Sequence, residues 1–244
     1  MNIDLFITRI KKGCRILSSP RLALAFFKHG VFAGTEHFPI LSSNLRTIID
    51  IGANKGQFAL ACRERAPFAR IISFEPLKAP AKIFKALFIN DAKVHLNEVA
   101  IGSRIQRSFI HVSAHDDSSS LLPIGANQVA LYPGTQEKES IEIDVAPLSS
   151  YLMPGDIESP AMLKLDVQGF EMEVLKGCES IIEKFDFIYC ECSFIELYSG
   201  QRLAYEIIEW LHQRQFKFIG IFNVSYDVKG QSIQADFLFK QEII

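Results

Sequence analysis

Apolar and polar positions along this chain predict strands and helices that alternate over most of its length. Short runs such as residues 47–49 and 187–189 are apolar on both faces, which is typical of strands buried in the middle of a parallel sheet. The segments between such strands predict helices that cover the sheet. The predicted strands are residues 46–51, 70–75, 94–99, 161–166 and 186–192, and the predicted helices are residues 56–66, 78–89, 170–183 and 202–215.

Two regions depart from this alternation. Residues 216–222 and 235–240 predict a hairpin at one edge of the sheet, which makes that edge antiparallel. An insertion over residues 102–147 separates the third and fourth core strands, and a Ser/Gly/Pro-rich loop joins its two expected strands, residues 108–113 and 140–145. Long loops at the ligand edge of such sheets are usually functional, so we expect the insertion to act as a lid.

The chain divides into an N-terminal helical extension, residues 1–45, and one domain, residues 46–244. Residues 2–31 carry apolar side chains at helical spacing, and Pro20 opens a second helix. Their opposite face is basic, which fits a solvated surface better than a membrane or nucleic-acid site. Three roles stay open for these helices: pairing two copies into a homo-oligomer, clamping a substrate, or docking on another protein.

Composition and charge narrow the classes of function. The 244 residues are 48% hydrophobic, which is enough for one good core, and the net charge of -2 at pH 7 gives no overall attraction to nucleic acid. No apolar run approaches the roughly 18 residues that span a bilayer, and no signal peptide is evident. The five scattered cysteines fit reduced thiols. We therefore expect a cytoplasmic protein with no transmembrane segment and no nucleic-acid partner.

A ligand site is expected where the first three strands end. Asp50 closes the first strand, and Gly52 lets a ligand approach the bare backbone behind it. Glu75 ends the second strand, where a carboxylate can accept hydrogen bonds from both hydroxyls of a ribose. The third strand closes with Ala100 and Ile101, which are small and apolar enough to form a wall for an adenine ring.

The carboxylate of Asp50 favours a ligand with a cationic group over a pyrophosphate. This points to S-adenosylmethionine, whose aminoacyl group carries an ammonium. A NAD-dependent oxidoreductase or epimerase is the nearest alternative, but it would carry Gly-x-Gly-x-x-Gly at this turn. A catalytically silent binding module is another. The predicted cofactor-binding residues are Asp50, Ile51, Gly52, Ala53, Asn54, Gly56, Phe58, Glu75, Pro76, Ala100, Ser118 and Asp166.

Seven short segments are the most distinctive parts of the chain. They are Asp50–Phe58, Ser73–Leu77, Val99–Gly102, Ser118–Leu122, Leu163–Glu171, Val174–Gly177 and Ala235–Phe239. In this order they resemble the FkbM family of S-adenosylmethionine-dependent methyltransferases over residues 46–240, and Leu163–Glu171 is the most specific match. The resemblance implies an α/β, class I methyltransferase (Rossmann-like) fold. Its seven-stranded, mostly parallel sheet would end in the antiparallel C-terminal hairpin, with the N-terminal helical extension and the inserted β-hairpin added.

The resemblance also implies methylation of a hydroxyl, commonly on a sugar or a natural product, so we expect a small-molecule or glycan acceptor. A hydroxyl needs a base within hydrogen-bond reach. Three residues are predicted to be catalytic: Asp166 at the end of the fourth strand, Glu191 near the end of the fifth, and His37, whose near-neutral pKa suits a base. The alternative roles are a helix cap for Asp166, a structural hydrogen bond for Glu191 and a surface position for His37. The acids and histidines lack metal-ligand spacing, so no metal is expected.

Overall fold

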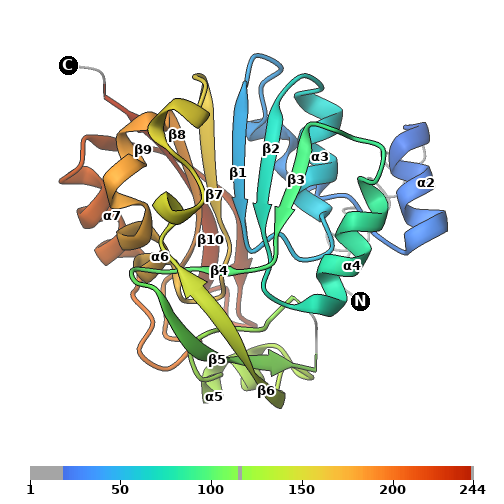
Figure 1. The fold of residues 1–244 in the computed structure, drawn as a ribbon. Coiled ribbons are helices and arrows are strands. Elements are labelled where there is room, and N and C mark those ends of the chain that lie inside the picture. The colour runs from blue at the N-terminus through green and yellow to red at the C-terminus, as the bar shows by residue number, and fades with distance from the viewer. Residues whose placement is uncertain (1–18, 115–116, 243–244) are drawn as a thin grey trace.

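The computed structural model describes residues 19–114 and 117–242, which form a seven-stranded sheet between two layers of helices (Figure 1). The strand order is β3-β2-β1-β7-β8-β10-β9, and only β10 runs antiparallel to its neighbours. This is the predicted fold class, with the predicted hairpin at one edge. The strands are β1 (Thr47–Ile51), β2 (Arg70–Phe74), β3 (Val94–Asn97), β7 (Ala161–Leu165), β8 (Phe187–Ser193), β9 (Phe216–Tyr226) and β10 (Ser232–Gln241).

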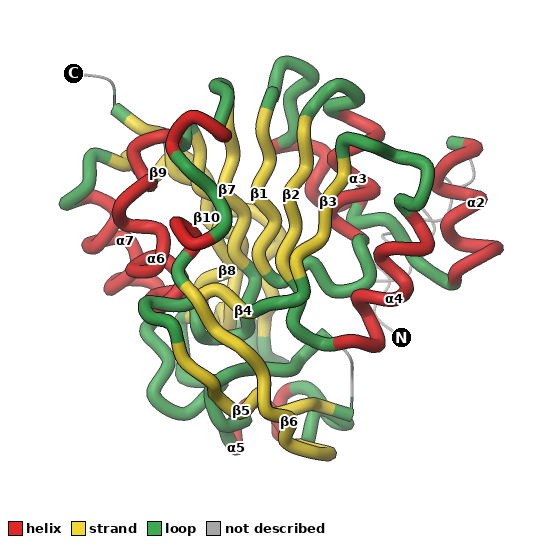
Figure 2. The backbone as a smooth tube through the Cα atoms, in the orientation of Figure 1, coloured by secondary structure: helices red, strands yellow, loops and turns green. Residues whose placement is uncertain are grey.

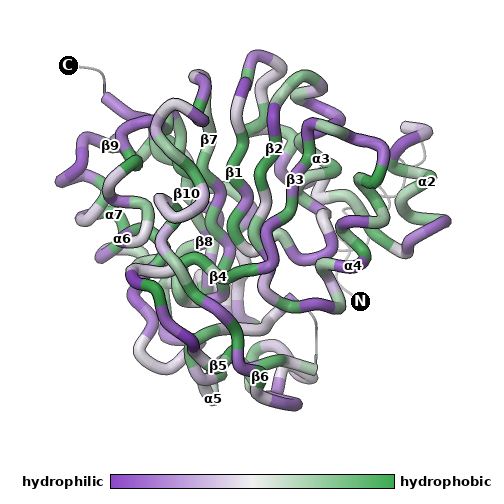
Figure 3. The backbone as a smooth tube through the Cα atoms, viewed as in Figure 1, coloured by the Kyte–Doolittle hydropathy of each residue, from purple (hydrophilic) through white to green (hydrophobic). Residues whose placement is uncertain are grey.

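The central strands are apolar on both faces because helices cover both. Ile48 packs in a cluster with Phe58 and Phe84 on one side of the sheet, whereas the adjacent Ile49 packs with Val174 and Leu211 on the other. Figure 3 shows this apolar character concentrated along β1, β2 and β7. The helices are α2 (Pro20–His29), α3 (Gln57–Arg65), α4 (Lys78–Leu87), α5 (Ala126–Leu131), α6 (Glu171–Cys178) and α7 (Ala204–His212), with 3-10 turns η1 (Thr35–Ile40), η2 (Leu148–Ser150), η3 (Pro154–Asp156) and η4 (Glu179–Lys184).

The described part of the N-terminal extension is α2 and the turn η1. Helix α2 begins at Pro20, as predicted, because the Ser19 hydroxyl accepts a hydrogen bond from the Leu22 amide (3.4 Å) and proline suits a first turn. It ends at Gly30, whose left-handed backbone (φ 67°) terminates the helix. The first predicted helix, within residues 2–18, lies outside the described residues. None of the described helices is long and apolar enough to cross a membrane.

The insertion, together with the two residues before it, forms a second, three-stranded sheet below the carboxyl ends of the main strands (Figure 2). Its strands are β4 (Ala100–Ile101), β5 (Gln106–Ser113) and β6 (Glu137–Ala146), in the order β4-β6-β5. The prediction that Ala100 and Ile101 close the third core strand is wrong, because they pair with Val145 and Ala146 instead. Strand β3 stops at Asn97, whose carbonyl accepts the last bond from the Glu75 amide; Pro76 has no N–H to continue the ladder.

Other element boundaries moved by a few residues. The predicted helix over residues 170–183 is split, because α6 ends at Cys178 and the chain continues as the 3-10 turn η4. Gly177 lies directly before this change, and glycine is a poor helix former. Helix α5 lies in the loop of the insertion, where no helix was predicted, so the insertion is more than a hairpin.

We predict that Gly177→Ala destabilises the fold. A Cβ atom at position 177 would lie 2.2 Å from the Gly102 carbonyl oxygen, so α6 and β4 would have to separate. The expected cost is about 1–3 kcal/mol in the free energy of unfolding, measured by urea denaturation. Gly155→Ala is the matched control, since nothing lies within 4 Å of its added Cβ. Equal stability of the two variants would contradict the packing of α6 on β4.

Candidate active site

A cavity of about 460 Å³ opens where β1, β2 and β7 end, facing the insertion. Ligands of open parallel sheets bind outside the carboxyl ends of the strands, so the cavity is the candidate active site. Its lining includes backbone and side chains from the first turn, the end of β2, strand β4, the insertion loop, the end of β7 and the η1 region. Among them are Ile51, Gly52, Ala53, Asn54, Phe58, Glu75, Pro76, Ala100, Ser119, Ser120, Lys164, Asp166, Gln168, Gly34 and His37.

The first turn needs its glycine because β7 passes directly against it. A Cβ on Gly52 would lie 1.8 Å from the Asp166 carbonyl oxygen, and its backbone is left-handed (φ 80°). The Gly52 and Ala53 amides both donate to the Phe74 carbonyl, at 3.1 and 3.0 Å, which ties the turn to β2. Asn54 follows in the left-handed region (φ 47°), which asparagine tolerates better than most residues.

Glu75 presents a buried carboxylate to this turn. Its Oε2 accepts a hydrogen bond from the Asn54 amide (3.0 Å), and its Oε1 accepts one from the Leu77 amide (2.8 Å). Each oxygen keeps a second lone pair for a ligand. Burial raises the pKa of Glu75 from 4.5 to about 7, although the two backbone hydrogen bonds oppose the shift. Glu75 therefore titrates within the ordinary working range of an enzyme.

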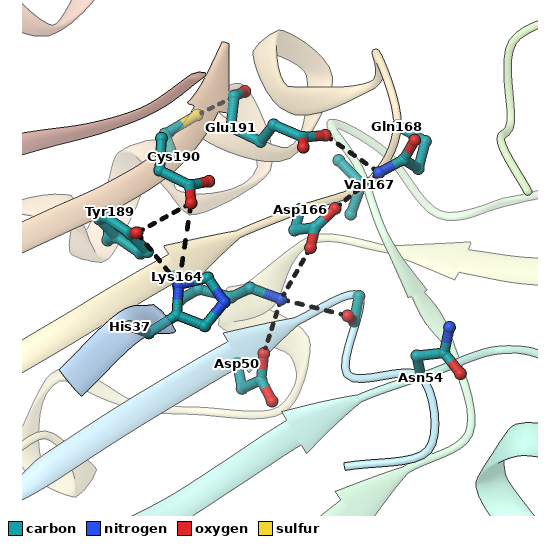
Figure 4. A network of polar contacts seen from close by, with 12 residues as sticks. His37, Asp50, Asn54, Lys164, Asp166, Val167, Gln168, Tyr189, Cys190 and Glu191 are labelled. Atoms are coloured by element: carbon teal, nitrogen blue, oxygen red, sulfur yellow. Dashed lines mark hydrogen bonds and ion pairs between the residues drawn. The ribbon is translucent and has the colours of Figure 1, made fainter. Parts of the chain in front are cut away.

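Lys164 is the central charge of the site, and the sequence analysis missed it. Its ammonium lies 3.1 Å from Asp50 Oδ1 and 3.5 Å from Asp166 Oδ2, reaching between the two acids as Figure 4 shows. Burial alone would lower the pKa of Lys164, but these carboxylates raise it above its ordinary value. The signal was present in the sequence, because a lysine inside the apolar strand 161–165 requires a buried partner.

Asp50 consequently faces Lys164 rather than a ligand. Its side chain is fully buried and is not part of the cavity lining, and burial raises its pKa while Lys164 opposes the rise. The expected contact between Asp50 and a cofactor ammonium is not available in this geometry. Gly56 also lies behind the cavity lining, where a Cβ would meet the Phe84 and Phe88 rings at 3.0 Å.

Gln168 connects the two predicted catalytic acids. Its Nε2 donates to Asp166 Oδ1 (2.8 Å) and to Glu191 Oε2 (3.0 Å), from a backbone held at φ 55°, which is strained for a residue other than glycine. Asp166 lines the cavity, whereas Glu191 does not, and the Gln234 amide occupies the other Glu191 oxygen (2.8 Å). Burial, then the nearby acids, raise the pKa of Glu191 well above its ordinary value.

Asp166 does not serve as the helix cap that was its alternative role. Among the described residues, no side-chain hydrogen bond caps the start of α6, and Glu171 Oε1 instead accepts hydrogen bonds from the Val167 (3.2 Å) and Gly169 (3.0 Å) amides of the turn before it. Burial raises the pKa of Glu171 to about 7, although these amides lower it. Asp166 is therefore left to face the cavity and Lys164.

His37 is not a surface histidine. The turn η1 places it in the cavity lining with its side chain only 16% exposed, and its ring meets the Phe58 ring edge-on at 5.2 Å between centroids. Gly34 makes room for it, because a Cβ there would lie 2.8 Å from His37 Cδ2. Burial lowers the pKa of His37 below its ordinary value, although Asp236 opposes the shift, and this favours the neutral ring.

The insertion loop lines the cavity with Ser119 and Ser120 rather than with the predicted Ser118. The Ser118 carbonyl accepts a hydrogen bond from the Tyr198 hydroxyl (3.2 Å), while Ser119 and Ser120 line the cavity. The Ser120 hydroxyl donates to the Gln168 carbonyl (2.6 Å), which fixes the loop to the end of β7. Among the described residues, no group of three or more His, Cys, Asp or Glu side chains could hold a metal ion.

The comparison that decides the family is with a family model. The methyltransferase FkbM domain matches residues 50–218, which include the first turn, Glu75, Lys164 and Asp166. The chain belongs to the methyltransferase FkbM family. Its relatives include the 2-O-methyltransferase NoeI of Sinorhizobium fredii, 31% identical over 67% of this chain and 70% of that protein.

A second relative is the hexuronic acid methyltransferase AglP of Haloferax volcanii, 27% identical over 58% of this chain and 54% of that protein. Solved structures with a similar trace include the precorrin-6y C5,15-methyltransferase of Geobacter metallireducens, with a TM-score of 0.47 and 10% identity over 85% of this chain and 86% of that one. Another is the fibrillarin of Aeropyrum pernix, solved with S-adenosyl-L-methionine. Its TM-score is 0.46, with 11% identity over 82% of this chain and 68% of that one.

We predict that Lys164→Met is strongly destabilising. It leaves Asp50 buried without a compensating charge, a change that typically costs about 3–5 kcal/mol in the free energy of unfolding. Lys176→Met is the control, since Lys176 pairs with Glu173 on the surface and such pairs contribute about 0–1 kcal/mol. Denaturant unfolding at pH 7 measures both, and adding Asp50→Asn to Lys164→Met should recover part of the loss. Similar stabilities for the two single variants would contradict the central role of Lys164.

Proposed function

We propose that this protein is an S-adenosylmethionine-dependent O-methyltransferase that acts on a hydroxyl of a saccharide or a glycosylated natural product. The observation that carries the proposal is that one cavity is lined by the Glu75 carboxylate, the His37 ring and Asp166. The relatives support the chemistry, because one is named for 2-O-methylation and another for methylation of a hexuronic acid.

The residues present fit this cofactor. Glu75 would accept hydrogen bonds from the ribose hydroxyls, and the small side chain of Ala100 beside Pro76 would leave room for the adenine. The Gln57 side-chain oxygen is buried at the cavity and accepts no hydrogen bond from the described residues, so it is an acceptor suited to the aminoacyl ammonium. When bound, the cofactor supplies a methyl group on a sulfonium and leaves as a neutral thioether.

His37 is the best placed base. A base must be unprotonated at the working pH, and burial holds the pKa of His37 below 6.5, whereas the neighbouring acids hold the pKa of Lys164 above its ordinary value. Lys164 therefore keeps its proton and cannot accept another. Asp166 would orient the acceptor hydroxyl. Glu191 would help to position Asp166, because the Gln168 amide bonds to both acids.

Calorimetry tests the proposal directly. We expect S-adenosylhomocysteine to bind with measurable heat and NAD to give none, because the first turn lacks the glycines that a diphosphate requires. A panel of saccharides and glycosides should then include an acceptor that releases S-adenosylhomocysteine. Heat with NAD alone would favour an oxidoreductase or epimerase, and cofactor binding without any transfer would favour a silent binding module.

The affinity for S-adenosylhomocysteine should depend on pH through Glu75. The ionised carboxylate accepts ribose hydroxyls, so affinity is full above its pKa of about 7 and falls as the pH drops through that value. Isothermal titrations between about pH 8 and about pH 6 measure the change. Glu75→Gln should weaken binding by about 1–3 kcal/mol and remove this step. A wild-type affinity that is flat over the range would remove Glu75 from the ribose site.

Turnover should identify the base. We expect His37→Gln to reduce kcat by about 100-fold or more while S-adenosylhomocysteine still binds, since a positioned base contributes roughly that much. Glu191→Gln is the comparison, and its effect should be smaller because its oxygens bond to Gln168 and Gln234 rather than facing the cavity. A larger loss with Glu191→Gln would reverse the assignment.

A further inference from the structure

Three polar side chains behind His37 form a network that the proposed transfer does not itself require. They are Tyr189 on β8, Asn223 on β9 and Asp236 on β10. The His37 Nδ1 atom lies 3.1 Å from the Tyr189 hydroxyl and 3.7 Å from Asp236 Oδ2. The Asp236 side chain is only 14% exposed, so water screens these contacts weakly.

The protons of this network can be assigned one by one. An ionised carboxylate only accepts hydrogen bonds, so the Tyr189 hydroxyl donates its proton to Asp236 Oδ2 (2.9 Å). The Asn223 amide donates to the same oxygen (2.7 Å) and to the Tyr189 oxygen (3.2 Å), and its nitrogen lies 3.5 Å from His37 Nδ1. Burial and Asp236 raise the pKa of Tyr189, so the hydroxyl keeps its proton. Towards His37, the Tyr189 oxygen is consequently an acceptor.

Because the Tyr189 oxygen accepts the hydrogen bond from the ring, the imidazole proton must be on Nδ1. A neutral imidazole has one N–H, so the other nitrogen, Nε2, carries the free lone pair. In the described part of the chain, the polar contacts of the ring are made by Nδ1, and Figure 4 shows the second ring nitrogen turned away from Tyr189. The imidazole packs edge-on against the Phe58 ring and occupies the space that a Cβ on Gly34 would need.

We propose that Asp236, acting through Tyr189, fixes His37 in the tautomer with the proton on Nδ1, so that Nε2 is the atom that accepts the proton of the acceptor hydroxyl. Asp236 and Tyr189 are thus positioning residues for the reaction. The inference rests on the proposed function, because only a transfer to a hydroxyl gives the Nε2 lone pair its role.

The proton and electron pairs balance in this step. The hydroxyl proton passes to Nε2 of His37, and the freed oxygen pair forms the bond to the methyl carbon. The pair that had joined this carbon to sulfur stays on sulfur. His37 becomes an imidazolium, which the Asp236 carboxylate near Nδ1 stabilises. The proton later leaves Nε2 to solvent, which restores the neutral base.

The tautomer can be measured by NMR on the full-length protein with 15N-labelled histidine, without cofactor or acceptor. The spectrum of His37→Gln identifies the His37 signals among the six histidines. Above the His37 pKa, the wild type should carry the proton on Nδ1. In Asp236→Ala, the Tyr189 hydroxyl loses its acceptor and can donate to Nδ1, so the proton should move to Nε2. Asp236→Asn keeps an accepting oxygen and should retain the Nδ1 proton.

Asp144→Ala is the matched control, since Asp144 is an exposed acid that pairs with Arg107 on the insertion. It should leave the His37 tautomer unchanged. A wild-type proton on Nε2 overturns the proposal by itself, even if Asp236→Ala fails to fold. An Asp236→Ala variant that folds and keeps the Nδ1 proton also overturns it.

Turnover gives a second measurement that a purely structural role would not alter in the same way. With an acceptor from the panel, Asp236→Ala should reduce kcat by about 100-fold with little change in KM, and Asp236→Asn should recover much of that loss. Unchanged kcat in a variant whose tautomer has switched would overturn the positioning role. Absence of S-adenosylhomocysteine binding in the wild type would instead count against the proposed function, and the tautomer result would stand apart from it.

Discussion

The buried ammonium of Lys164 is the interaction on which the rest of the site depends. It bonds the ends of β1 and β7 at the centre of the sheet, where Asp50 and Asp166 would otherwise repel each other in a medium of low dielectric constant. Asp50 and Lys164 are also direct neighbours in the strand register, so the ion pair forms only when β1 and β7 are correctly aligned. The same charge that secures the sheet therefore also contacts Asp166, an acid that lines the cavity.

Local chemistry explains what the sequence could predict. The glycine turn after β1, the left-handed Asn54 and the acid after β2 are each required by a short stretch of backbone, and all three lie in the cavity lining as expected. The apolar strands and the terminal hairpin were predictable for the same reason, since a strand buried on both faces has a visible pattern. Turns and strands that are determined by residues adjacent in the sequence could therefore be predicted from it.

Long-range packing explains what could not be predicted. The sequence left a surface position open as the alternative for His37, because the side chains that bury its ring, Tyr189 and Phe58, come from β8 and α3. Asp236 lies near the site because β10 is placed between β8 and β9, where Asp236 is the register partner of Glu191. Ala100 was assigned to the wrong sheet since its partner, Val145, lies at the far end of the insertion.

The insertion belongs to the site rather than merely covering it. The Ser120 hydroxyl donates to the Gln168 carbonyl, and the Tyr198 hydroxyl shares its one hydrogen between the Gln168 side-chain oxygen (2.8 Å) and the Ser118 carbonyl (3.2 Å), so the strained Gln168 is held from both sides. Its remaining amide hydrogens bind Asp166 and Glu191. Ser120 and Tyr198 therefore hold the backbone and the side chain of Gln168, whose amide in turn holds Asp166 at the cavity.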